Sequence, residues 1–210
     1  MASLLDRSLE EKNGFDAADI LERYLAWYRA GGFDTGPVAG RVFDLVLEGM
    51  SHADAVRQVH LETGCRTAGC NPAHRIAPLA ASPDVADSQL AHAAKTEAAL
   101  THFDALAGDV SAATAILIRC LIKGASWTDA LERAATGRMP ETRLAMAGFA
   151  NGVRRPTGYA PDVLAAAVHF VGTGKGYRKA LEAAIEFAGP ANYCPVLVGA
   201  IGAVRYPDDV

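Results

Sequence analysis

Hydrophobic side chains recur at helical spacing along the whole chain. In residues 16–34, Ile20, Tyr24 and Trp27 fall on one face of a helix, and the pair Gly31-Gly32 ends the pattern. The same spacing returns in the segments 37–50, 51–64, 84–100, 108–124, 126–137, 160–174, 176–190 and 194–206. No convincing alternation of period two between turns indicates a strand. The pattern predicts an all-α protein of about nine or ten helices.

Local signals mark where some of these helices begin. Ser51 with Asp54, and Ser126 with Asp129, have the spacing of a capping box. Pro161 stands where a first helical turn tolerates a missing N–H. Hydrophobic residues make up 50% of the chain and aromatic residues only 7%, a composition that favours closely packed, Ala-rich helices. The length of 210 residues suits a single domain, 1–210, with a sizeable core.

The charge of the chain and its N-terminal residues argue against nucleic-acid binding and against secretion. The formal net charge is −4, and no block of Lys or Arg offers a surface for nucleic acid. The first fourteen residues include acidic ones where a signal peptide needs an apolar run, so we expect no secretion. No apolar stretch reaches the about 18 residues of a membrane span. The 4 cysteines then indicate thiols in a cytoplasmic protein rather than disulfides.

The segment 64–79 concentrates chemically reactive side chains and allows three interpretations. His60, Cys65, Cys70 and His74 are four zinc-compatible ligands, although their spacing is wider than that of common zinc knuckles. Cys70, before a helix start, is a candidate nucleophilic thiol, but no base is identified beside it. The third interpretation is a turn in which the cysteines are small, weakly polar residues, and it is favoured over the other two.

A family resemblance gives this segment a fourth interpretation. The stretches "NGFDAADILERYLAWYRAGGFDTG", "AGCNPAHRIAPLA", "THFDALA", "GYAPDVLAAAVHF" and "YRKALEAAIEFAGPANYCPVLVGAIGAVRY" together resemble, in collinear order, the ADP-ribosylglycohydrolase family. That family includes the dinitrogenase reductase activating glycohydrolases. The resemblance covers nearly the whole chain. It implies an all-α fold and, in ordinary members, a pair of Mg or Mn ions.

The resemblance makes the segment after Gly69 a ligand-binding loop. Family members read approximately Gly-Asn-Gly-(Ser/Ala)-x-Met-Arg-x-Ala-Pro here, and the loop and the following helix start hold the ligand. Gly69 and Arg75 fit, whereas Cys70 replaces the Asn, Asn71 the Gly and His74 the Met. Capture of an anion at a helix start remains feasible, but the loop is bulkier than in the family.

The metal ligands of the family are where the chain departs most. The family's Asp-x-Asp-Thr motif falls on Pro190, Ala191, Asn192 and Tyr193, which include no carboxylate. The family's Thr-Asp-Asp triplet would precede Met1. Mg-class ions require several oxygen ligands, chiefly carboxylates. We therefore expect no metal and no cofactor, and no release of ADP-ribose by the family's metal-dependent route.

Other family positions persist and suggest a pocket. His102 and Asp104 match a turn in which the family's His helps to bind ligand, and Tyr159 matches an element beside the pocket. Each has a structural alternative, since His102 and Asp104 could cap the next helix and Tyr159 could be packed. We expect one mostly neutral, partly apolar cleft, and the residues expected to line it are Cys70, His74, His102, Asp104, Tyr159, Tyr193 and Cys194.

Together these observations favour a metal-independent enzyme that acts on a small molecule by acid–base chemistry. The candidate catalytic residues are His102, Asp104, His74 and Tyr193, and the candidate ligand-binding residues are Gly69, Cys70, Asn71, Tyr159, Asn192 and Cys194. The alternatives are a non-catalytic descendant that binds a ligand or a protein, and a truncated ADP-ribosyl hydrolase. If the family's first helices are absent, core faces would be exposed, and a homodimer that covers them is expected.

Overall fold

The chain is all-α, as the hydrophobic pattern predicts. The structure is a computed structural model, and it describes residues 1–151, 156–191 and 193–209. Within these residues there are α-helices and two short 3₁₀ helices but no strand. The α-helices are α1 (Ala2–Lys12), α2 (Ala17–Arg29), α3 (Pro37–Leu47), α4 (His52–Glu62), α5 (Asn71–Arg75), α6 (Ala77–Ala81), α7 (Asp87–Ala99), α8 (Ala105–Ile122), α9 (Trp127–Ala135), α10 (Pro140–Ala145), α11 (Ala160–Thr173), α12 (Tyr177–Ala188) and α13 (Tyr193–Arg205).

The helices of the described part of the chain number 13, more than the nine or ten that the periodicity predicts. The difference comes mainly from short elements. The helices α5 and α6 have 5 residues each, and α10 has 6, which is too short for a hydrophobic repeat to register. Two proline starts, Pro72 and Pro78, separate α5 from α6 where a single loop and helix were expected.

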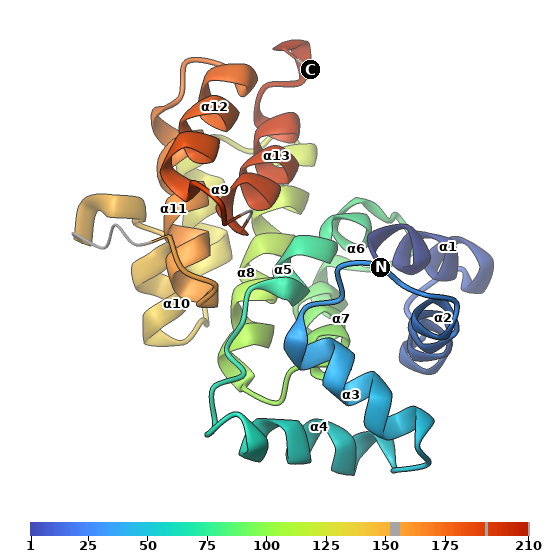
Figure 1. Cartoon of the computed structure of the whole chain (residues 1–210). Coiled ribbons are helices and arrows are strands. Elements are labelled where there is room, and N and C mark those ends of the chain that lie inside the picture. The colour runs from blue at the N-terminus through green and yellow to red at the C-terminus, as the bar shows by residue number, and fades with distance from the viewer. Residues whose placement is uncertain (152–155, 192, 210) are drawn as a thin grey trace.

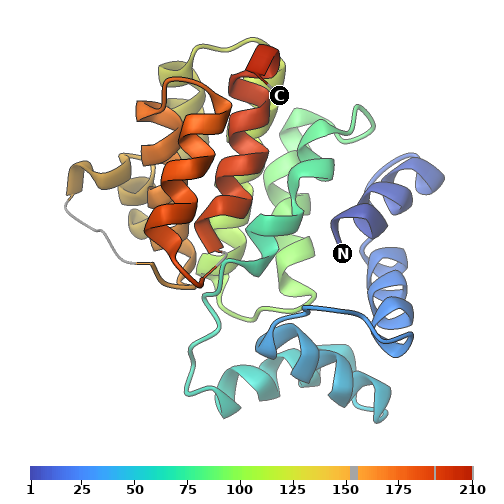
Figure 2. The same cartoon turned by 45° about the horizontal axis from the view of Figure 1, so that its top comes forward.

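The helix α8 is the centre of the fold. Helices α5, α6, α7, α9, α10, α11 and α13 all contact it, and Figures 1 and 2 show α9–α13 on one side of it and α1–α4 on the other. Small residues allow this close packing. A Cβ added at Gly108 would lie 3.4 Å from the Cα of Lys95 on α7, so the two helices approach nearly backbone to backbone.

Length and apolar composition alone would let α8 cross a membrane, in contrast to the sequence expectation that no stretch is long enough. It spans 18 residues, and 78% of them are buried inside the structure, as is usual for a core helix of a soluble protein. Its two charged side chains have partners there. Asp109 pairs with Lys95 and Arg138, and Arg119 donates to several backbone carbonyls, among them that of Ser82 at 2.7 Å.

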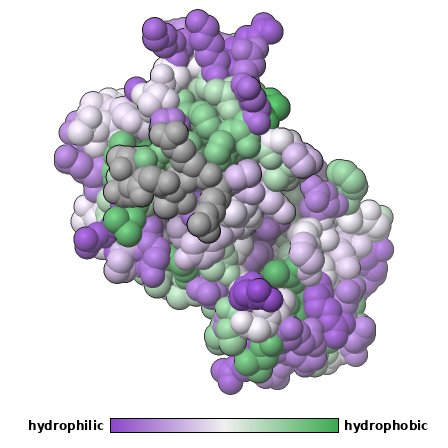
Figure 3. Space-filling view, turned by 60° about the vertical axis from the view of Figure 1, so that its left-hand side comes forward, coloured by the Kyte–Doolittle hydropathy of each residue, from purple (hydrophilic) through white to green (hydrophobic). Residues whose placement is uncertain are grey.

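The surface over α10 to α12 is mixed in character. Figure 3 shows the side that carries α10 to α12, where hydrophobic areas lie among hydrophilic ones. Ile185 on α12 is 53% exposed, and such single apolar residues are common on folded proteins.

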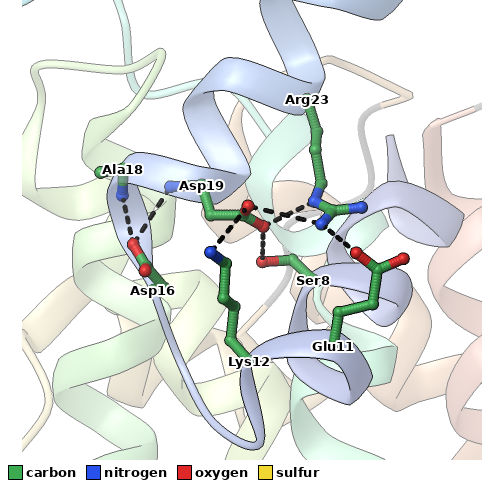
Figure 4. A network of polar contacts seen from close by, with 7 residues as sticks. All are labelled: Ser8, Glu11, Lys12, Asp16, Ala18, Asp19 and Arg23. Carbon is green, nitrogen blue, oxygen red and sulfur yellow. Dashed lines mark hydrogen bonds and ion pairs between the residues drawn. The ribbon is translucent and has the colours of Figure 1, made fainter.

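A charged network joins α1 to α2 (Figure 4). Asp19 accepts hydrogen bonds from Ser8 at 2.6 Å and from Arg23, and Lys12 lies 3.4 Å from its other oxygen. Arg23 also donates to Glu11 at 2.6 Å. The hydrogen bond from Arg23, followed by that from Ser8, lowers the pKa of Asp19 to about 2. The network therefore fixes the first helix, which the sequence pattern did not identify, to the second.

Replacing Asp19 with Asn is expected to lower the free energy of unfolding by about 1 kcal/mol at pH 7, since the site is partly exposed and water screens it. The pKa is lower in the folded state, so the stabilisation is present above the unfolded value of 3.8 and is lost as the pH falls towards 2. Thermal unfolding from pH 7 down to pH 3 measures this. The control is Glu182→Gln in the exposed Arg178–Glu182 pair, and equal midpoints for Asp19→Asn and wild type at pH 7 would contradict the prediction.

Candidate functional site

The predicted ligand loop is held by backbone hydrogen bonds to the start of α11. Gly69 and Tyr159 form an isolated antiparallel bridge. The N–H of Ala160 donates to the carbonyl of Ala68 at 2.9 Å, and the N–H of Cys70 donates to the carbonyl of Gly158 at 3.1 Å. The loop at 68–70 and the segment at 158–160, far apart in sequence, therefore form one wall.

This wall borders a cleft of about 520 Å³ between the core helices and the first part of the chain. Five of the residues that the sequence nominated line it, namely Gly69, Asn71, His74, His102 and Tyr193. The sequence expectation that His102 and Tyr193 share a cavity agrees with this geometry. The rest of the lining includes Met1, Ala2, Trp27, Phe33, Asp34, Thr35, Gly36, Pro37, Val38, Arg66, Arg75, Gly158 and Val196.

Glycines let the lining side chains approach the backbone closely. A Cβ at Gly69 would lie 3.1 Å from Nε2 of His102, and one at Gly158 would lie 3.3 Å from the ring of Tyr193. At Gly36, where φ is 75°, a Cβ would lie 2.8 Å from Nδ2 of Asn71. Each glycine thus leaves room for a side chain that faces the cleft.

Other nominated residues lie elsewhere. Asp104 caps α8, accepting from the N–H of Leu106 at 2.9 Å, which is the structural alternative raised from sequence. It lies at a second cavity of about 150 Å³, which shares His102 with the cleft. Tyr159 contributes its backbone to the bridge, and its side chain is 41% exposed outside the cleft lining. Asn192 lies outside the described residues.

The two predicted cysteines of the site are buried and poorly reactive. Cys70 is 1% exposed, and burial raises the pKa of its thiol to about 12. Burial also raises the pKa of Cys194 to about 11, and its Sγ donates to the carbonyl of Ala184 at 3.6 Å. Both stay protonated near neutral pH. A thiol nucleophile, one interpretation of segment 64–79, is therefore not supported.

His102 is neutral and nearly enclosed. It is 2% exposed, and burial, followed by the positive charge of Arg75, lowers its pKa to about 3. Its Nδ1 lies 2.8 Å from Oγ1 of Thr101. A histidine with so low a pKa holds no charge near neutral pH, so it acts there through hydrogen bonds rather than as a proton donor in its charged form.

His74 is neutral for a similar reason. Burial lowers its pKa to about 4, Arg75 adds to the effect, and the backbone of Tyr193 and the carboxylate of Asp34 oppose it. Its Nε2 is buried and has no hydrogen-bond partner among the described residues. A buried nitrogen without a partner costs free energy unless a ligand or water satisfies it.

The residues around the cleft do not match a site for Mg or Mn. No group of three or more His, Cys, Asp and Glu side chains in the described ranges could hold a metal ion. Asp34 is the one carboxylate among the cleft-lining residues of the described chain. Hard cations need several such oxygens, so the donor set does not fit a binuclear site.

The zinc interpretation of segment 64–79 fails on the placement of its ligands. Nδ1 of His60 lies 2.7 Å from Oγ1 of Thr67, and its ring packs against Phe103 with 4.8 Å between centroids. Cys65 is exposed whereas Cys70 is buried. His60 therefore secures the loop to the turn at 102–104, because Thr67 also accepts from the N–H of Asp104 at 3.2 Å.

A buried ion pair lies behind the cleft, and its acidic member was not predicted. Arg75 is 4% exposed and Glu97 is 0% exposed, and Nε of Arg75 donates to Oε1 of Glu97 at 2.5 Å. The hydroxyl of Tyr24 donates to the same oxygen at 2.8 Å. The guanidinium also stacks over the Tyr24 ring, 5.3 Å from its centroid. The Arg75 guanidinium is thus fixed in orientation.

A family model described as ADP-ribosylglycohydrolase matches residues 1–207. Among solved structures, an "ADP-ribosylglycohydrolase-related protein complex" is similar with a TM-score of 0.73 and 25% identity, over 98% of this chain and 69% of that chain. No curated protein matches this sequence.

Proposed function

The chain belongs to the ADP-ribosylglycohydrolase family. We propose that it binds a small, ring-bearing, uncharged molecule without a divalent metal. The observation that carries the proposal is the cleft of about 520 Å³, whose lining includes neutral His74 and His102 together with the aromatic residues Trp27 and Tyr193. Aromatic faces with a few fixed polar groups are the usual lining of small-molecule sites.

The charges of the cleft favour an uncharged ligand. The Arg75 guanidinium is neutralised by buried Glu97, which leaves Arg66 and Asp34 as the remaining charged side chains in the described lining, one of each sign. A pyrophosphate would gain from Arg66 but would be repelled by Asp34. A nucleoside or sugar ring, which bears hydroxyls and an aromatic or apolar face, is uncharged and avoids the repulsion by Asp34.

Acid–base catalysis by the two histidines has weaker support than binding. A general acid or base works best when its pKa is near the working pH, whereas burial lowers those of His74 and His102 to about 4 and about 3. Asp104 is engaged as a helix cap. Metal-independent catalysis therefore stays a prediction, and so do the homodimer and the cytoplasmic location.

Adenosine is expected to quench the fluorescence of Trp27 saturably. The chain has 2 Trp residues, so Trp127→Phe leaves Trp27, which lines the cleft, as the reporter. Asn71→Ala is expected to weaken adenosine binding about tenfold by removing a polar contact, equivalent to about 1.4 kcal/mol. The control Ile185→Ala, on the exposed side of α12, should leave it unchanged.

The same protein sample distinguishes metal-free binding of an uncharged ligand from the family's metal-dependent hydrolysis. With Mg²⁺ or Mn²⁺ added, we expect no release of ADP-ribose from ADP-ribosylated arginine and no tighter binding of adenosine. Metal-dependent release would show the family hydrolysis instead. ADP-ribose that binds more than about tenfold tighter than adenosine would show that the ligand is charged, and the absence of any Trp27 response would refute the binding proposal.

A further inference from the structure

Thr101 connects the buried ion pair to the histidine of the cleft. Nη2 of Arg75 donates to Oγ1 of Thr101 at 2.8 Å, and the same oxygen lies 2.8 Å from Nδ1 of His102. Thr101 is 0% exposed, so water does not compete for its hydroxyl. Among the hydrogen bonds of the described chain, Oγ1 of Thr101 has these two partners and no other.

The protons in the two hydrogen bonds of Thr101 can be placed by counting donors and acceptors. A guanidinium has no acceptor, so Thr101 must accept from Arg75. The single hydroxyl proton of Thr101 is then free for its other neighbour, and it can go to Nδ1 of His102 only if that nitrogen carries no proton. A neutral imidazole holds its proton on the other nitrogen, so Nε2 of His102 is the N–H.

The other tautomer, with the proton on Nδ1 of His102, would leave the Thr101 hydroxyl without an acceptor among the described residues. If Nδ1 of His102 carried the proton, Oγ1 of Thr101 would accept twice, from His102 and from Arg75. Its own proton would then have no acceptor within the described part of the chain. A buried hydroxyl without an acceptor costs about 1–3 kcal/mol, enough to favour the first tautomer at least about fivefold.

The proton on Nε2 faces the cleft. A Cβ at Gly69 would lie 3.1 Å from this nitrogen, and both residues line the cleft. The missing side chain of Gly69 therefore leaves the N–H accessible from the loop side. Asn71 lies close by, since the same Cβ would be 3.7 Å from its Oδ1.

We infer that Thr101 is a positioning residue that holds His102 as a neutral Nε2–H donor, so that the cleft selects a ligand with an uncharged hydrogen-bond acceptor at this point. The inference about the ligand rests on the proposed function, whereas the tautomer does not. A ring nitrogen, a carbonyl oxygen or a sugar oxygen would satisfy the N–H. A group that only donates, such as an ammonium, would meet a like-signed proton.

Long-range ¹H–¹⁵N NMR of the unliganded protein labelled in histidine tests the tautomer directly. His102→Gln identifies the signals of His102. In the wild type, we expect a protonated Nε2 and an unprotonated Nδ1. Thr101→Val keeps the side-chain shape but removes the hydroxyl, and it is expected to populate the Nδ1–H form, whereas Thr101→Ser should match the wild type. A wild type with Nδ1–H, or a Thr101→Val spectrum identical to it, overturns the inference.

Adenosine tests the selection of the ligand. We expect Thr101→Val to weaken adenosine binding about tenfold and Thr101→Ser to change it less than about threefold. If Thr101→Val changes the tautomer but not the binding of adenosine, the role of Thr101 in ligand selection is wrong. If the wild type has the predicted tautomer and binds no adenosine, the proposed function and the ligand class both fail and the positioning role holds. Because the wild-type signals of His102 are assigned with His102→Gln and not with Thr101→Val, a Thr101→Val protein that does not fold still leaves the tautomer decided.

Discussion

Replacing Arg75 with alanine is expected to lower the free energy of unfolding by about 3–5 kcal/mol, a large part of the stability of an ordinary domain. The substitution leaves the Glu97 carboxylate, at 0% exposure, without its charged partner. One oxygen of Glu97 already lacks a partner among the described residues, so the loss cannot be made up locally. Urea denaturation followed by circular dichroism measures the effect.

The control for Arg75→Ala is the same substitution at an arginine whose ion pair is exposed to solvent. Arg178 pairs with Glu182 at 2.8 Å, and the two side chains are 87% and 61% exposed. Arg178→Ala should therefore change stability little. The double variant Arg75→Met with Glu97→Gln should recover part of the loss, because it removes both charges and leaves an acceptor for Tyr24. If Arg75→Ala is as mild as Arg178→Ala, the buried pair does not stabilise the fold as predicted.

The wild-type protein is expected to lose stability steadily as the pH falls from about 6.5 to about 4. Folding lowers the pKa of His102 from 6.5 to about 3 and that of His74 from 6.5 to about 4. In this window the unfolded chain binds protons that the folded chain cannot, so protonation draws the equilibrium towards the unfolded state. No stability is lost at pH values above 6.5, the pKa of histidine in the unfolded chain, and the loss at the acid end is on the order of a few kcal/mol.

Denaturant midpoints between pH 7.5 and pH 4.5 measure this dependence. His102→Gln removes one of the two titrations and should flatten the slope, whatever it does to the absolute stability. His92 is exposed, so His92→Gln should leave the slope as it is in the wild type. A wild-type stability that does not vary over this range would mean that the two histidines are hydrated in the folded state.

The fold could be predicted from sequence because its helices are long enough to show their period. The structure confirms the all-α class, and capping signals were placed correctly at Ser51 and Ser126, which both accept from the N–H three residues on. The first helix escaped notice because its apolar stripe is short: Leu5 and Leu9 are its buried apolar side chains, and its polar contacts come from Asp19 and Arg23 of the next helix.

The candidate site was predicted in part, and the failures have physical reasons. The resemblance to the family, motif by motif along the chain, identified the loop at Gly69 and the turn at His102, and these two segments lie next to each other in the structure. It could not distinguish Asp104 as a cap from Asp104 as a ligand group, since both uses place a carboxylate in the same turn. It also could not show that Cys70 and Cys194 face inwards.

Glu97 is the residue that sequence reasoning could have found and did not. It follows Leu90, Ala93 and Ala94 on one helical face, so a carboxylate stands in an apolar stripe. Such a charge must have a buried partner. Trp27 and Arg66, by contrast, line the cleft through loop and helix-end geometry that no local pattern specifies.

The central position of α8 has a consequence for the order in which the molecule acquires its structure. The helix contacts α7 before it and α9 after it, so a large part of the core forms between neighbours in the chain. Contacts of this kind form early, at small loop-closure cost. The cleft, in contrast, joins Met1 and residues 33–38 to Tyr193 and Val196, near opposite ends of the sequence. It is therefore among the last features to close, and local opening that leaves the core intact would begin there.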